Sequence, residues 1–72
     1  MDIDILYKQI GKNIKKYREM RNLTQQELAE KTNLGLNFIG KIEIAFSRPS
    51  LKTLCAIANV LDIKIENLFK FD

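Results

Sequence analysis

The sequence predicts an all-α fold of five helices, and three observations support this prediction. Apolar residues in the first twenty positions recur at the spacing of one helix face. Thr24 precedes Glu27 by three residues, which is the pattern of a capping box at the start of a helix. Further along, Ser50 stands before an apolar run with helical spacing, as an N-cap residue does.

The first helix is expected from about Ile3 to Met20. Asp2 and Asp4 lie near its start, where the helix dipole favours negative charge. Its apolar face follows spacings of four, four and three residues: Leu6, Ile10, Ile14 and Tyr17. We expect the helix to end at Arg21 and Asn22, after which Leu23 enters the core.

The second and third helices are expected to be short and closely joined. The second runs from Thr24 to Thr32 and ends near Asn33, because asparagine tolerates the left-handed conformation of a C-cap. Leu28 and Ala29 supply its buried side. The third runs from about Gly35 to Ile44, and its expected core residues are Phe38, Ile39 and Ile42. Two helices joined this tightly predict a helix-turn-helix, a motif of DNA-binding proteins.

The last two helices are expected to close the core. Pro49 and Ser50 start the fourth helix, and its expected core residues follow helical spacing: Leu51, Leu54, Ile57, Ala58 and Leu61. Cys55 is expected to be a packing residue, since no basic partner activates its thiol. A short fifth helix near Ile65 to Phe69 should depend on tertiary contacts, chiefly those of Leu68.

Length and composition limit the classes of function. Seventy-two residues allow one small domain, expected over 1–72, and an apolar fraction of 46% with 29% charged residues is typical of a folded chain. One cysteine and no histidine exclude a zinc finger, a Cys–His dyad and an acid–base histidine. No paired carboxylates stand out either. We therefore expect no enzyme activity, no metal and no cofactor.

The charge and the N-terminus indicate a partner and a compartment. A net charge of +3 and a pI near 9.2 favour a polyanionic partner. The first residues lack the basic region and apolar run of a signal peptide, and no apolar stretch could span a membrane. We expect a cytoplasmic protein whose cysteine is reduced.

Several spaced motifs resemble one family: Thr24-Gln25-x-x-Leu28-Ala29, Leu34, Ile39, Ile42-Glu43 and Pro49-Ser50-Leu51. They are similar to the lambdoid-repressor-like helix-turn-helix domains, which include phage repressors, Cro proteins and Xre-type relatives. The resemblance extends from about Ile10 to Phe69. It implies a compact five-helix domain and a sequence-specific transcriptional regulator, with repression as the expected outcome. Such a protein binds a two-fold DNA site as a homodimer, and its third helix enters the major groove.

Candidate base-reading residues share the outer face of the third helix: Leu36, Asn37, Gly40 and Lys41. Asn37 can donate to and accept from adenine, and Lys41 can reach guanine or a phosphate. Leu36 offers only apolar contact, for example with a thymine methyl group. Gly40 costs about 1 kcal/mol in a helix interior, a cost that close approach of the backbone to DNA would explain.

Candidate phosphate-binding residues are Thr24, Gln25, Ser47 and Arg48. The first two lie at a helix N-terminus, which attracts anions, and the others offer a hydroxyl and a guanidinium. The resemblance implies that Gln25 contacts phosphate or braces a reading side chain. It also implies a structural ion pair between Arg18 and Glu43. Phe69 and Phe71 are candidates for the dimer contact.

The sequence departs from the family at two positions and leaves an alternative function open. Ala45 stands where relatives commonly have glycine, so the third helix is expected to end differently or its loop to shift. Phe46 replaces a residue that is usually polar or basic. Leu36, Ile44 and Phe46 together could instead form an apolar surface of a protein-interaction module.

Overall fold

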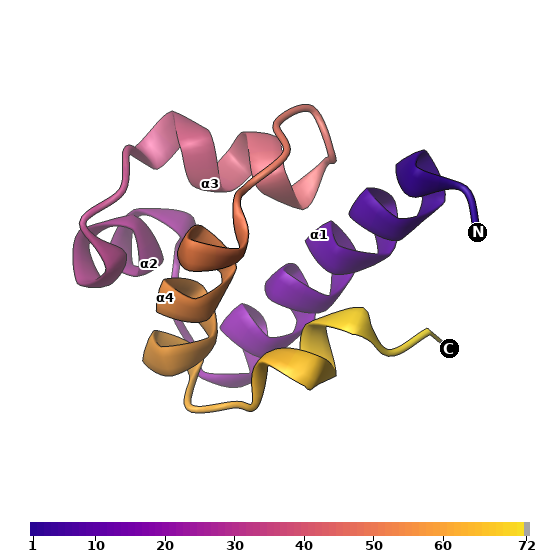
Figure 1. Ribbon diagram of the computed structural model, residues 1–72. Coiled ribbons are helices and arrows are strands. Elements are labelled where there is room, and N and C mark those ends of the chain that lie inside the picture. The colour runs from indigo at the N-terminus through magenta and orange to yellow at the C-terminus, as the bar shows by residue number, and fades with distance from the viewer. Residues whose placement is uncertain (72) are drawn as a thin grey trace.

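A computed structural model describes residues 1–71, which contain helices and no strand (Figure 1). Four α-helices follow one another: α1 (Ile3–Met20), α2 (Gln25–Thr32), α3 (Leu36–Glu43) and α4 (Leu51–Leu61). The predicted fifth helix is the 3-10 helix η1 (Ile65–Phe69) and not an α-helix. Its five residues are too few for a stable α-helix. Asn67 N donates to Lys64 O at 2.9 Å, which is the i to i+3 pattern of a 3-10 helix.

The long helix α1 supports the other elements. It contacts α3, α4 and η1, while α2 packs against α3 and α4. Figure 1 shows η1 lying along α1 on the side away from α3. Within residues 1–71, η1 therefore packs on α1 and α4 and leaves one side of the helix-turn-helix formed by α2 and α3 uncovered.

Every helix contributes to the core, which consists mainly of isoleucine and leucine. The buried apolar residues are Ile10, Ile14, Leu28, Ala29, Ile39, Ile42, Leu54, Ile57, Ala58, Leu61 and Leu68. Leu68, the residue through which η1 was predicted to contact the core, is fully buried. Leu23 and Phe38 are half-buried and pack against this core.

Side-chain caps explain why the helix boundaries were predictable from the sequence. Thr24 Oγ1 accepts from Glu27 N at 3.0 Å, and Thr24 N donates to Glu27 Oε1 at 2.9 Å, which completes the capping box. Ser50 Oγ accepts from Thr53 N at 3.2 Å at the start of α4. Asp2 caps α1 in the same way.

Left-handed residues end the helices and turn the chain. Asn22, Asn33, Ala45 and Asp62 have φ between 56° and 62°, and none is a glycine. Ala45 takes this conformation at 62° although its Cβ opposes it. Phe46 N and Ser47 N both donate to Lys41 O, at 2.8 and 3.2 Å, so the turn after α3 closes with an alanine in the left-handed conformation.

Two predictions for α4 are wrong. Leu51 is 67% exposed, and Cys55 is exposed as well. At 3.6 residues per turn, both lie beyond the edge of the face formed by Leu54, Ile57 and Leu61. Leu51 is also the first residue of the helix, where the chain has only begun to approach the core.

A buried asparagine holds the C-terminal segment against α1. Asn13 is 5% exposed, and its Nδ2 donates to Leu68 O and to Lys70 O, each at 2.9 Å. Both carbonyl groups belong to the end of the described chain, far from Asn13 in sequence. The amide thus fixes η1 beside α1.

Candidate nucleic-acid interface

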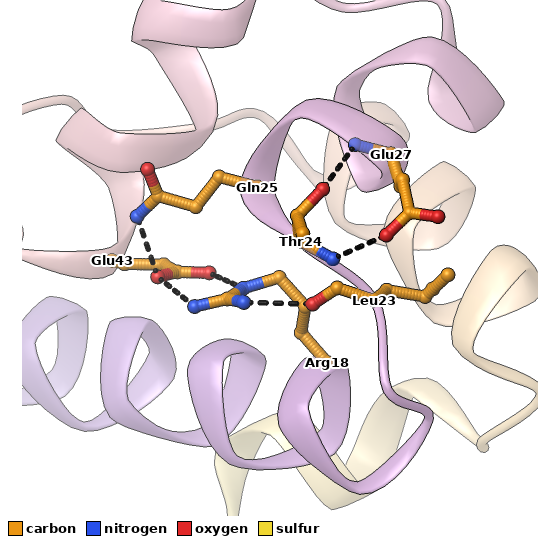
Figure 2. A network of polar contacts seen from close by, with 6 residues as sticks. All are labelled: Arg18, Leu23, Thr24, Gln25, Glu27 and Glu43. Carbon is orange, nitrogen blue, oxygen red and sulfur yellow. Dashed lines mark hydrogen bonds and ion pairs between the residues drawn. The ribbon is translucent and has the colours of Figure 1, made fainter.

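A buried ion pair joins α1 to the end of α3, as the family resemblance implied (Figure 2). Arg18 Nε donates to Glu43 Oε2 at 2.7 Å, and Arg18 Nη2 donates to Glu43 Oε1 at 3.1 Å. The side chains are only 10% and 2% exposed. The hydrogen bond to Glu43 raises the pKa of Arg18 above its ordinary value, so the guanidinium stays charged.

Two further contacts extend the ion pair to the start of α2. Arg18 Nη1 donates to Leu23 O at 2.8 Å, and Gln25 Nε2 donates to Glu43 Oε1 at 3.0 Å. Figure 2 shows the Gln25 amide pointing at the Glu43 carboxylate from the first turn of α2. These residues, Arg18, Leu23, Gln25 and Glu43, are called the Glu43 network below. The network fixes the relative position of α1, α2 and α3.

Gly11 allows the close approach of helices on which this network depends. A Cβ atom at Gly11 would lie 2.5 Å from Ile42 O and 2.6 Å from Glu43 O. Both atoms belong to the backbone of α3, which cannot move aside as easily as a side chain could. Gly11 is not among the residues predicted from the sequence, although a glycine directly after Ile10 in an amphipathic helix is a signal of close contact.

The N-terminus of α2 is fixed by the capping box. The pKa of Glu27 lies below its ordinary value. The main cause is the hydrogen bond that its carboxylate accepts from the backbone N–H of Thr24, and hydrogen bonding with the Thr24 side chain adds to it. The cap holds Thr24 in place and leaves the end of α2 exposed beside Gln25. An end of this kind suits an anion.

The outer face of α3 combines two polar side chains with several apolar ones. Leu36 is 48% exposed, and Asn37 and Lys41 are also exposed. Gly40 is half-buried, and a Cβ atom there would lie 3.4 Å from Gln25 Oε1, an ordinary contact distance. The four predicted base-reading residues therefore lie on α3, and Gly40 lies next to Gln25 at the start of α2.

The segment after α3 places Phe46 and Arg48 differently from what their types suggest. Phe46 is 75% exposed, and the Lys41 ammonium lies 5.7 Å from the centre of its ring. Arg48 pairs with Asp4 at the start of α1 and lies over the Tyr7 ring at 5.1 Å. Ser47 is half-buried. A predicted phosphate ligand, Arg48, is thus paired with a carboxylate of the same chain.

The two dimer candidates differ in exposure. Phe69 is half-buried and packs against the core, whereas Phe71 is 43% exposed.

Within residues 1–71, no pocket and no cluster of metal-ligating side chains is found. No helix in that range is both long and apolar enough to cross a membrane.

The chain is similar to known regulators in sequence and in structure. The helix-turn-helix family HTH_3 matches residues 14–68. The immunity repressor of Bacillus phage phi105 is 45% identical over 56 residues, covering 78% of this chain and 39% of the repressor. The chain thus spans well under half of that relative's length.

Two solved structures share the fold closely. The restriction-modification controller C.AhdI from Aeromonas hydrophila has a TM-score of 0.85 at 27% identity, covering 88% of this chain and 96% of its own. The biofilm regulator SinR, solved in complex with DNA, has a TM-score of 0.80 at 32% identity, covering 85% and 98%. With the match over residues 14–68, the chain belongs to the HTH_3 helix-turn-helix family.

Proposed function

We propose that this protein is a sequence-specific DNA-binding transcriptional regulator that acts as a repressor through α3. The observation that carries the proposal is the Glu43 network, which holds α3 rigidly while leaving its outer face exposed. A preformed helix of this kind can enter a major groove without a large ordering cost. The likeness to SinR, which was solved with DNA, supports the same assignment.

In this proposal, base reading belongs to the outer face of α3. Asn37 forms paired hydrogen bonds with adenine, and Lys41 reaches guanine or a phosphate. Leu36 makes apolar contact, and Gly40 lets the helix backbone come close to the bases. The exposure of Leu36, Asn37 and Lys41 supports these roles.

Phosphate contacts flank the reading helix at both ends. Thr24 and Gln25 lie at the N-terminus of α2, and Ser47 and Arg48 follow α3. Gln25 gives one amide hydrogen to Glu43, so its second hydrogen is the one proposed to reach a phosphate oxygen. Arg48 exchanges Asp4 for phosphate when DNA binds.

We further propose that residues 1–72 act as one DNA-binding domain in the cytoplasm and pair as a homodimer. Phe71 supports the pairing, because it exposes an aromatic ring beside the C-terminus. Two recognition helices would then read half-sites about 34 Å apart. Sedimentation of the wild type and of Phe71→Ser tests this arrangement. If both proteins remain monomeric up to high concentration, the arrangement is contradicted.

The test of the function is fluorescence anisotropy on labelled duplex DNA taken from upstream of the protein's own gene. A shuffled duplex of equal length is the control, and each is titrated at two salt concentrations. We expect tighter binding to the native duplex and a steep loss of affinity with salt, since phosphate contacts release counterions. No binding to either duplex at low salt would contradict the proposal.

A matched pair of variants separates base reading from a general effect of charge or folding. Asn37→Ala removes the proposed adenine reader, whereas Asn59→Ala removes an exposed asparagine of α4. We expect Asn37→Ala to reduce the preference for the native duplex by about 10-fold or more, which corresponds to roughly 1–3 kcal/mol. Asn59→Ala should keep the preference.

The alternative is a protein-interaction module on the same fold. The observation that favours this alternative is the exposure of two large apolar side chains, Ile44 at 74% and Phe46 at 75%. Such a module would keep its partner after substitution of Asn37 and Lys41 but lose it after substitution of Leu36, Ile44 and Phe46. The anisotropy titration distinguishes the two functions, because the module would not prefer the native duplex.

A further inference from the structure

We infer that the 5-methyl groups of thymine contribute directly to recognition of the operator half-site, with Leu36 as the residue that selects them. The inference rests on the proposed function and names the chemistry that the same surface reads. It follows from the composition of the α3 face, which is more apolar than a hydrogen-bonding reader requires.

Few side chains of α3 are placed to meet the bases. Leu36 is 48% exposed at the first position of α3, where a recognition helix points into the groove. Gly40, one turn later, has no side chain to offer. The Lys41 ammonium lies 5.7 Å from the Phe46 ring centre, toward the end of α3. The first turn of α3 therefore presents Leu36 and Asn37.

The major groove of DNA presents both polar groups and an apolar one. Its base edges carry hydrogen-bond donors and acceptors, and thymine alone of the four bases adds a methyl group. A leucine pressed against a polar edge removes water without replacing its hydrogen bonds, which costs free energy. Against a thymine methyl group, the same leucine buries apolar surface on both sides. Leu36 thus discriminates in favour of thymine.

The neighbouring residue strengthens the preference for the same type of base pair. Asn37 is suited to paired hydrogen bonds with adenine, the partner of thymine. Adjacent side chains on α3 can therefore read adjacent A·T pairs. Ile44, 74% exposed at the C-cap of α3, adds a second apolar group on the same face. The predicted half-site is rich in A·T pairs under the first turn of α3.

The experiment compares thymine with uracil, which lacks only the methyl group. The wild-type protein first selects a preferred duplex from a random-sequence library. That duplex is then made again with deoxyuridine replacing thymidine in the half-sites, and in a second version only outside them. We expect the half-site replacement to weaken binding at least about fivefold, as expected for one or more lost methyl contacts. The outer replacement should change little.

Two variants assign the effect to one residue. Leu36→Ala should bind the thymine duplex more weakly and bring the uracil-to-thymine ratio of dissociation constants below about twofold. Lys41→Ala should weaken binding to both duplexes in parallel and keep the ratio. Both residues are exposed, and thermal unfolding of each variant checks that the fold is intact.

The outcomes separate this inference from the proposed function. A selected sequence that the wild type binds equally well with thymine and uracil would overturn the methyl readout and leave the regulator standing. A library that yields no preferred sequence would overturn the proposed function and the inference with it. A large wild-type ratio that Leu36→Ala leaves unchanged would overturn the assignment to Leu36.

Discussion

At the scale of single residues, Glu43 carries a buried charge where α1, α2 and α3 meet. Its carboxylate accepts hydrogen bonds from Arg18 and from Gln25, and its side chain is 2% exposed. A substitution that removes one of these donors would leave the carboxylate charge unpaired, and this would lower the stability of the fold. This position is sensitive to changes that remove a donor, even where they add apolar surface.

Replacing the arginine tests this sensitivity. Arg18→Met keeps much of the volume but leaves Glu43 unpaired, so we expect the free energy of unfolding to fall by about 3–5 kcal/mol. Arg21→Met is the matched control, because its partner Asp62 is 3.9 Å away on the exposed surface. The control should change stability by about 0.5 kcal/mol or less. Urea unfolding measures both, and equal losses would contradict the structural role.

Glu27 gives the chain a predicted sensitivity to acid. Its pKa is lower in the folded protein than the ordinary 4.5, so its stabilising effect is complete above that value. The effect is lost as the pH falls through the lower, folded-state pKa. Glu27→Gln can keep a capping box without titrating, so we expect it to flatten the dependence of stability on pH in this acidic range. Thermal unfolding at a series of pH values checks this, and an unchanged slope would contradict it.

At the scale of elements, two glycines in helices have different roles. A Cβ atom at Gly11 would clash with the backbone of α3, whereas a Cβ atom at Gly40 would make an ordinary contact with Gln25. The fold therefore requires glycine at position 11 and not at position 40. The proposed approach of the α3 backbone to DNA is what would make glycine matter at position 40.

The two alanine substitutions make this difference measurable. Gly40→Ala should leave the fold intact or stabilise it by up to about 1 kcal/mol, while weakening DNA binding if the helix backbone approaches the bases. Gly11→Ala should destabilise the fold by about 1–3 kcal/mol. Chemical unfolding and anisotropy give the two values. Undiminished DNA affinity of Gly40→Ala would rule out close approach at that position.

Helix ends were predictable from the sequence because local side chains set them. Thr24, Ser50 and Asn33 act on their own neighbouring backbone, so their effect can be read without knowing the fold. The exposure of Leu51 could not be read in this way. Leu51 lies just beyond the edge of the buried face of α4, where helical spacing alone does not decide burial, and its place in the first turn leaves it exposed.

The candidate site was predictable in part. The family resemblance supplied the pairing of Arg18 with Glu43, and helical spacing supplied the exposed face of α3. The bond from Gln25 to Glu43 and the pairing of Arg48 with Asp4 join residues distant in sequence. Such contacts depend on how whole helices pack, which no local pattern reports.

At the scale of the whole molecule, one basic side chain near α3 is paired with a carboxylate of the same chain. The chain has a net charge of +3, yet Arg48 is paired with Asp4 on α1. The two side chains are 50% and 62% exposed, so the pair contributes little to stability. In the proposed complex its larger effect would be on binding, because Asp4 would compete with phosphate for the Arg48 guanidinium and repel the DNA backbone.

Removing this carboxylate should strengthen DNA binding. We expect Asp4→Asn to tighten binding by about three- to tenfold at low salt, with a smaller gain as salt screens the charge. Glu66→Gln is the control, because it changes the net charge equally on η1, on the far side of α1 from α3. If both variants gain equally, the effect comes from net charge and not from Arg48.

The separation of α3 into a held side and a free side has an evolutionary consequence. Ile39, Ile42 and Glu43 maintain the fold, while Leu36, Asn37 and Lys41 take no part in the core. Mutation can therefore alter the second set without endangering folding. Duplicated copies of such a gene can diverge toward separate targets within one genome, and an engineer can transplant the outer residues of one copy into another to redirect it.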